Sequence, residues 1–206
     1  MHLNKSLKSF NSFGVDSSAS KYVRIEKAEQ LKKILSANAN DKKIVLGGGS
    51  NILFTKKFDG LCIHMQNKGI KIISETDKNV IVEINSGENW HKFVLWCLKK
   101  DFGGVENLAL IPGSVGAAPI QNIGAYGVEL KDVFVSCMTI NIESLQTKRF
   151  KINDCKFGYR DSIFKRELKN KIIILNIQLK LSKHNHKFNL NYESLKKLKN
   201  IKKLNL

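Results

Sequence analysis

The segment at residues 111–128, I-P-G-S-V-G-A-A-P-I-Q-N-I-G-A-Y-G-V, constrains the fold of this chain more than any other part of it. It contains both prolines of the chain and is dense in glycine and alanine. Because its side chains are small, the segment cannot fill a core by itself; it lets the backbone approach another part of the molecule or a ligand. The alternative is a glycine-rich surface loop with only a structural role.

A second glycine segment, L-G-G-G-S-N at residues 46–51, follows one short apolar run and precedes another. We therefore expect a strand at 44–46, a glycine turn, and a strand at 52–54. Consecutive glycines can turn several backbone N–H groups toward one point and bind a phosphate there. The segment lacks the GK[ST] ending of a P-loop, and no helix opens after it as in a Rossmann fold. An ordinary tight turn is the alternative, but two such segments together predict a large diphosphate ligand gripped mainly through backbone.

Composition narrows the class of protein. A chain of 206 residues with 42% hydrophobic residues can build one good-sized core or two small lobes. Its net charge of +17 comes almost wholly from lysine and would attract anionic small molecules. The arginine and aromatic patterns of nucleic-acid binding are missing, so we expect no nucleic-acid partner.

The chain has no long apolar run and no secretory signal at its start, so we expect no membrane partner and a cytoplasmic location. Its four cysteines are widely separated and include no C-x-x-C pair. This spacing predicts reduced thiols and no metal site.

The periodicity of apolar residues predicts helices at 26–39 and 89–100. We expect further strands at 61–65, 70–73, 80–84, 133–142 and 172–181, the last of them central in its sheet. This order is neither strict alternation of strands and helices nor all-β. It predicts an α+β chain in two lobes, with the glycine segments at the seam between them.

The polar cluster F-G-Y-R-D-S-I-F at residues 157–164 is the best candidate for chemistry. Arg160 could offer its donors to a carboxylate or to a developing enolate oxygen, or it could form a structural ion pair with Asp161. Tyr126 could pack on a ring, bind a phosphate or be structural. Gln121 and Asn122 could bind a heterocycle or satisfy the loop backbone.

Four segments in the same order closely resemble the UDP-N-acetylenolpyruvoylglucosamine reductase family: L-G-G-G-S-N, S-G-E-N-W-H at 86–91, residues 106–130, and F-G-Y-R-D-S-I-F. N-S-F-G at residues 11–14 resembles the start of that family. The resemblance implies a two-lobed FAD-binding fold of the p-cresol methylhydroxylase type. It also implies a first FAD-binding lobe at 1–67, a second at 68–183, and the start of a truncated substrate-binding region at 184–206.

The resemblance further implies FAD as cofactor, NADPH as reductant and a UDP-sugar as substrate, whose enolpyruvyl group is reduced for peptidoglycan synthesis. Arg160 matches the family's arginine that stabilises the enolate, and Tyr126 and Tyr192 are the implied substrate contacts. Two groups of residues are the implied cofactor contacts: Gly47, Gly48, Gly49, Ser50 and Asn51 in the first glycine segment, and Pro112, Gly113, Ser114, Gly116, Ala117, Ile120, Asn122, Ile123 and Gly124 in the second.

The sequence departs from the family pattern in one respect. The G-S-F-F-K-N-P-like segment that carries the family's proton-donor serine, and the later catalytic glutamate, do not occur in these 206 residues. Three interpretations therefore stay open: a working reductase, a catalytically impaired FAD-binding remnant that lacks its substrate domain, and a first part whose missing domain is supplied by a separate chain. A basic anion-binding protein without flavin is the remaining alternative.

Overall fold

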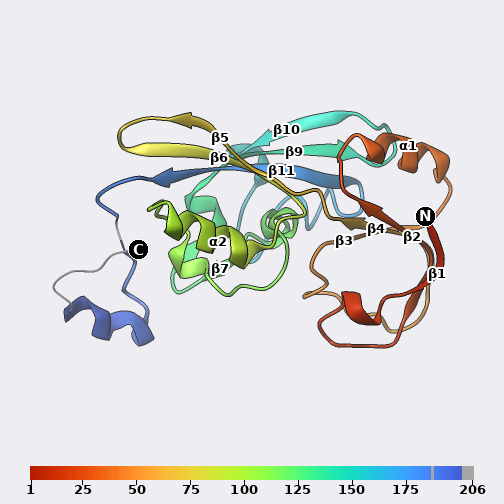
Figure 1. Ribbon diagram of the computed structural model, residues 1–206, viewed down its shortest axis with the longest axis horizontal. Helices are drawn as coiled ribbons and strands as arrows, with labels where there is room; N and C mark the ends of the chain where they lie inside the picture. Colours follow the sequence, from red (N-terminus) through yellow and green to blue (C-terminus); the bar gives the residue numbers. More distant parts are fainter. Residues whose placement is uncertain (187, 201–206) are drawn as a thin grey trace.

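The computed structural model describes residues 1–186 and 188–200, and its strands form two main sheets side by side (Figure 1). The first sheet has four strands in the order β1-β2-β4-β3. These strands are β1 (His2–Ser6), β2 (Ser18–Ile25), β3 (Lys43–Leu46) and β4 (Phe58–Met65). β1 is antiparallel to β2, whereas β2, β4 and β3 run parallel.

Helix α1 (Gln30–Ala37) crosses between β2 and β3 and is shorter than the predicted 26–39. Leu31 and Leu35 are buried on its inner face, in a cluster with Ile25 and Ile63 of the first sheet. The same cluster includes Ile140 and Ile173 of the second sheet, so α1 lies where the two sheets meet. The helix therefore helps to fix one lobe against the other.

The second sheet has five antiparallel strands in the order β10-β9-β11-β6-β5. They are β5 (Ile70–Glu75), β6 (Asn79–Asn85), β9 (Phe134–Asn141), β10 (Thr147–Lys151) and β11 (Ile172–Ser182). β11 lies at the centre, which confirms the prediction made from its apolar run. All strands of the first sheet fall within residues 1–67, and all strands of the second within 68–183.

Helix α2 (Trp90–Lys99) covers one face of the second sheet (Figure 1). Its predicted apolar stripe is confirmed: Trp90, Phe93, Val94 and Cys97 are buried there and belong to the main core. The side chain of Asn89 caps the helix by accepting a hydrogen bond from the backbone N–H of Lys92 at 2.9 Å. Such a cap satisfies one of the free N–H groups at a helix start.

The predicted strand at 52–54 is wrong, because these residues are irregular chain that follows a turn at 50–51. β4, which follows, inserts between β2 and β3, so residues 52–54 connect β3 to β4 without joining the sheet. Phe54 instead packs into a small apolar cluster with Leu7 and Leu46. Within this apolar run, Phe54 is buried, whereas Leu53 is exposed.

The remaining elements are short. The hairpin of β7 (Gly124–Ala125) and β8 (Val128–Glu129) follows the second glycine segment. The 3-10 helices are η1 (Lys8–Phe10), η2 (Glu106–Leu108), η3 (Val115–Gln121), η4 (Leu130–Asp132), η5 (Ile152–Cys155) and η6 (Glu193–Asn200). Of the region expected at 184–206, residues 187 and 201–206 lie outside the described residues. Among the described helices, none is long and apolar enough to span a membrane.

Candidate functional site

The two glycine segments lie against each other at the junction of the sheets. A β-carbon built on Gly47 would lie 2.2 Å from Oγ of Ser114, and one on Gly48 would lie 2.8 Å from Cα of Gly113. Real β-carbons do not approach that closely, so any larger residue would push the segments apart. The glycines thus allow a direct contact between backbones more than sixty residues apart in sequence.

The second segment is held by the turn that precedes α2. The N–H of Trp90 donates to the carbonyl of Gly113 at 3.0 Å, and the N–H of Gly116 donates to the carbonyl of Ser86 at 2.9 Å. A β-carbon on Gly116 would lie 2.5 Å from Cβ of Ser86. These contacts fix the segment at the same junction without a regular sheet.

Seven backbone N–H groups where the two segments meet make no hydrogen bond within the described residues. In residues 1–186 and 188–200, no acceptor takes a hydrogen bond from the amides of Gly47, Gly48, Gly49, Ser50, Asn51, Gly113 or Ser114. Gly49 is buried, and buried backbone donors without a partner are rare. A group of converging free amides is suited to an anion such as a phosphate. On this observation, the two segments fit a diphosphate.

A cavity of about 290 Å³ is lined by Gly47 and Ser114 of this group and by residues of both sheets. Its wall includes Gly47 and Met65 from the first sheet and Ile173 from the second. Ser114 and Ile120 contribute from the second glycine segment, and Phe164 from the loop after Arg160. The wall is mainly apolar, as sites for flat organic ligands are.

His64 is a buried polar residue that contacts the first glycine segment through the backbone of Gly47. Nδ1 of His64, on β4, lies 2.6 Å from the hydroxyl oxygen of Tyr22, on β2. Burial lowers the pKa of His64, and the charge of Arg24 lowers it further, while a hydrogen bond with the Gly47 backbone opposes them. Burial thus favours the neutral form of the imidazole beside the segment.

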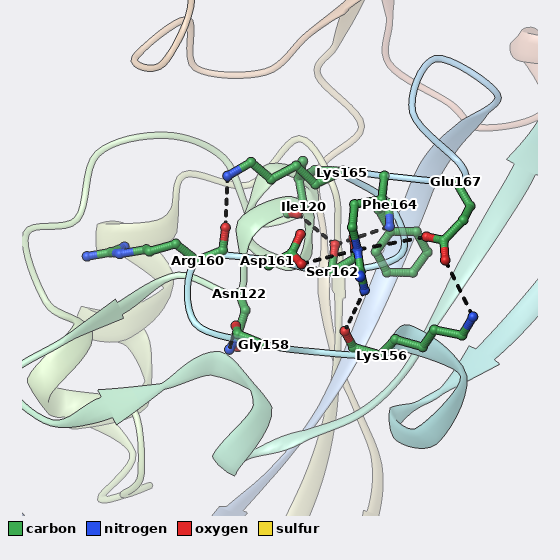
Figure 2. Close-up of polar contacts among 11 residues, drawn as sticks. Ile120, Asn122, Lys156, Gly158, Arg160, Asp161, Ser162, Phe164, Lys165 and Glu167 are labelled. Atoms are coloured by element: carbon green, nitrogen blue, oxygen red, sulfur yellow. Dashed lines mark hydrogen bonds and ion pairs between the residues drawn. The ribbon is translucent and has the colours of Figure 1, made fainter.

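The loop that carries Arg160 is attached to the second glycine segment (Figure 2). Nη2 of Arg160 donates to the carbonyl of Gly124 at 2.8 Å. Asp161 pairs instead with Nε of Arg166 at 3.1 Å, so the ion pair between Arg160 and Asp161 that the sequence left open is not formed. Arg160 is exposed and has no carboxylate partner in the described part of the chain. Its remaining donors are free to bind an anion.

Among the other predicted site residues, some are exposed at the surface and some are buried in the core. The rings of Tyr126 and Tyr192 are both exposed and lie edge to face, with centroids 5.2 Å apart. The side chain of Asn51 donates to that of Gln121 at 3.3 Å, which links the two segments. Asn122 is fully buried: its amide donates to the Gly158 carbonyl and accepts from the N–H of Lys131. Ile123 is in the main core.

A family described as "FAD binding domain" matches residues 19–141, which include both glycine segments. The chain belongs to this family. UDP-N-acetylenolpyruvoylglucosamine reductase of Flavobacterium johnsoniae is 53% identical over 92% of this chain and 56% of its own length. The protein of the same name from Amoebophilus asiaticus is 45% identical over 95% of this chain and 58% of its own length. The chain thus spans about half the length of the curated relatives that it matches.

Solved structures show the same fold. UDP-N-acetylenolpyruvylglucosamine reductase from Thermus caldophilus superimposes with a TM-score of 0.73 at 21% identity, over 94% of this chain and 65% of that one. A solvent-stable cholesterol oxidase superimposes with a TM-score of 0.58 at 16% identity, over 85% of this chain and 37% of that one. The predicted α+β, two-lobed FAD-binding fold is therefore confirmed.

Sequence reasoning missed two residues that support the site of this FAD-binding domain. Asn67, after β4, is 3% exposed and accepts hydrogen bonds from the hydroxyl of Ser86 and from the N–H of Gly87. Its own amide donates to the carbonyl of Leu175 at 3.0 Å. Ser162, in the Arg160 loop, is fully buried. Asn67 lies in no recognisable motif, and Ser162 lies in F-G-Y-R-D-S-I-F, where the pattern directed attention to Arg160. The partners Leu175 of Asn67 and Ile120 of Ser162 are distant in sequence.

Proposed function

We propose that this chain binds FAD at the seam of its two sheets and, with NADPH as reductant, reduces the enolpyruvyl group of UDP-N-acetylenolpyruvoylglucosamine to give UDP-N-acetylmuramate for peptidoglycan synthesis in the cytoplasm. One observation carries the proposal: amides without a protein acceptor occur in both glycine segments, and two of the residues that bear them, Gly47 and Ser114, line an interlobe cavity, in a chain 53% identical to a reductase of that name. Bound FAD would supply the hydride chemistry, which no side chain can provide.

The residues of the two glycine segments would hold the cofactor. The amides of residues 47–51, with those of Gly113 and Ser114, would bind its diphosphate through backbone donors. Gly116, Ala117 and Ile120 line the adjoining cavity and would pack on the rest of the molecule. The two segments would close on the ligand from opposite lobes and keep water from it.

Arg160 would act on the substrate. One of its donors is used by the Gly124 carbonyl, and this bond orients the guanidinium beside the β7–β8 hairpin. The remaining donors would bind the substrate carboxylate and the oxygen on which enolate charge develops, where a fixed cation lowers the barrier. The exposed edge-to-face pair of Tyr126 and Tyr192 would contact the nucleotide portion of the UDP-sugar.

A second candidate is FAD binding without turnover. The FAD binding domain family matches residues 19–141, and the chain spans about half the length of these relatives, so FAD binding is the part of the activity that the matched residues support directly.

The test is NADPH oxidation by the purified chain with FAD, in the presence and absence of the enolpyruvyl sugar nucleotide. Oxidation that depends on the sugar nucleotide supports the reductase. A yellow protein that retains FAD and shows no such oxidation supports the second candidate. A colourless protein that takes up no FAD would overturn both.

A further inference from the structure

The hydroxyl of Ser162 joins two walls of the interlobe cavity. It donates to the carbonyl of Ile120 at 2.7 Å and accepts from the N–H of Phe164 at 3.1 Å (Figure 2). Ile120 belongs to η3 and Phe164 to the loop after Arg160, and both line the cavity. Ser162 itself is fully buried and does not line it.

Two further bonds run beside this one. The amide of Asn122 donates to the Gly158 carbonyl at 3.0 Å, and the Arg160 guanidinium donates to the Gly124 carbonyl at 2.8 Å. Alternate residues 120, 122 and 124 are thus each attached to the loop at 158–162. Arg160 has a φ of +52°, and its carbonyl accepts from Nζ of Lys165 at 2.8 Å. The loop is held in a strained conformation by contacts on both sides.

Of the bonds described above, only those of the Ser162 hydroxyl connect two residues that line the cavity, Ile120 and Phe164. If the hydroxyl were removed, the Ile120 carbonyl would lose its buried donor and the Phe164 N–H its buried acceptor. A buried polar group left without a partner is unfavourable, so the walls would move apart or admit water. Either change alters the shape of the cavity and the placement of Arg160, two residues away.

We propose that Ser162 is a positioning residue, whose hydroxyl sets the distance between the Ile120 and Phe164 walls and so the fit of the flavin cofactor in the seam. This inference rests on the proposed FAD binding. It assigns Ser162 no contact with cofactor or substrate, because the side chain is fully buried and does not line the cavity. Its effect passes through Ile120, Phe164 and the backbone of Arg160.

The experiment compares Ser162→Ala with Ser17→Ala, a matched control. Ser17 is also a buried serine whose hydroxyl donates to a backbone carbonyl, that of Lys56 at 2.9 Å, and it does not line the cavity. FAD affinity is measured by quenching of flavin fluorescence, and the visible circular dichroism of the bound flavin reports its environment. The melting temperature of each apoprotein is measured in parallel.

Both variants are expected to lower the melting temperature, because Ser162→Ala loses two hydrogen bonds of a buried hydroxyl and Ser17→Ala loses one. Only Ser162→Ala should weaken FAD binding, by about tenfold as for the loss of roughly 1.4 kcal/mol, and change the dichroism of the flavin. Equal FAD affinity and equal spectra for the two variants would overturn the inference. Failure of the unaltered protein to bind FAD would instead refute the proposed function.

A second variant covers the case in which Ser162→Ala does not fold. Ser162→Cys keeps a polar atom in the same place, but a thiol is a weak donor and acceptor. We expect this variant to fold and to bind FAD about threefold or more weakly, with a smaller spectral change. Unaltered affinity and spectrum in the folded cysteine variant would contradict a positioning role.

Discussion

A β-carbon on Gly49 would lie 1.9 Å from the carbonyl oxygen of Phe10. At the same contact, the N–H of Ser12 donates to the Gly49 carbonyl at 3.0 Å. The N-terminal segment therefore packs directly on the glycine loop that we propose for the diphosphate. Because Gly49 also has a φ of +66°, two independent constraints select glycine there.

We expect Gly49→Ala to destabilise the protein by about 3 kcal/mol, since left-handed strain of about 1–2 kcal/mol adds to the clash with Phe10. Urea denaturation measures this. Gly14→Ala is the control, because Gly14 has a φ of +63° with no atom within 4 Å of the added carbon. It should show the strain alone, and equal losses in the two variants would contradict the close approach to Phe10.

Asn67→Ala is expected to lower the free energy of unfolding by about 3 kcal/mol. The substitution removes three hydrogen bonds of the Asn67 side chain and leaves the buried Ser86 hydroxyl without its acceptor. The Leu175 carbonyl keeps the N–H of Ser86, and the Gly87 N–H keeps the backbone carbonyl of residue 67. Chemical denaturation of this variant should be compared with that of Asn40→Ala at an exposed site. A loss under about 1 kcal/mol at Asn67 would mean that the hydrogen bonds of its side chain do not hold the two lobes together.

The stability of the apoprotein should fall as the pH drops below the ordinary His64 pKa of 6.5. The folded pKa is lowered, mainly by burial and next by Arg24, so the unfolded chain binds the proton more tightly. The contribution of His64 is therefore complete above pH 6.5 and is lost as the pH falls through the folded pKa. The charge of Lys68 also lowers the His64 pKa, whereas the hydrogen bond with the Gly47 backbone raises it.

Melting curves between pH 5 and 8, roughly the range in which histidine titrates, would measure this dependence. His64→Gln cannot titrate but can still bind Tyr22, so its curve should be flatter over this range. Parallel curves for the two proteins would show that another group controls the acid sensitivity.

Arg160→Lys should lower substrate-dependent turnover by about 100-fold or more, while the FAD affinity stays unchanged. A lysine has no planar fork with which to bind the Gly124 carbonyl and a carboxylate together. Arg24→Lys is the matched control, because Arg24 is an exposed arginine paired with Glu26 at 3.2 Å. Normal turnover by the Arg160 variant would remove Arg160 from the proposed chemistry.

Much of the fold could be predicted from local patterns in the sequence. The apolar stripe of α2 and the isoleucine run of β11 are long, periodic signals, and both elements formed as expected. The run at 52–54 was misread because apolar residues are needed equally for a strand and for an irregular segment packed on a core. Only the neighbours of Phe54, which are remote in sequence, distinguish the two.

The sequence by itself determined the two glycine segments and the family pattern, because backbone freedom and small side chains are properties of single residues. The tertiary structure alone decided that Gly47 meets Ser114, that Asp161 pairs with Arg166 instead of Arg160, and that Asn122 is used inside the protein. It also revealed Asn67 and Ser162. Hydrogen bonds and close contacts are relations between atoms brought together by folding, and no local pattern specifies which partners will meet.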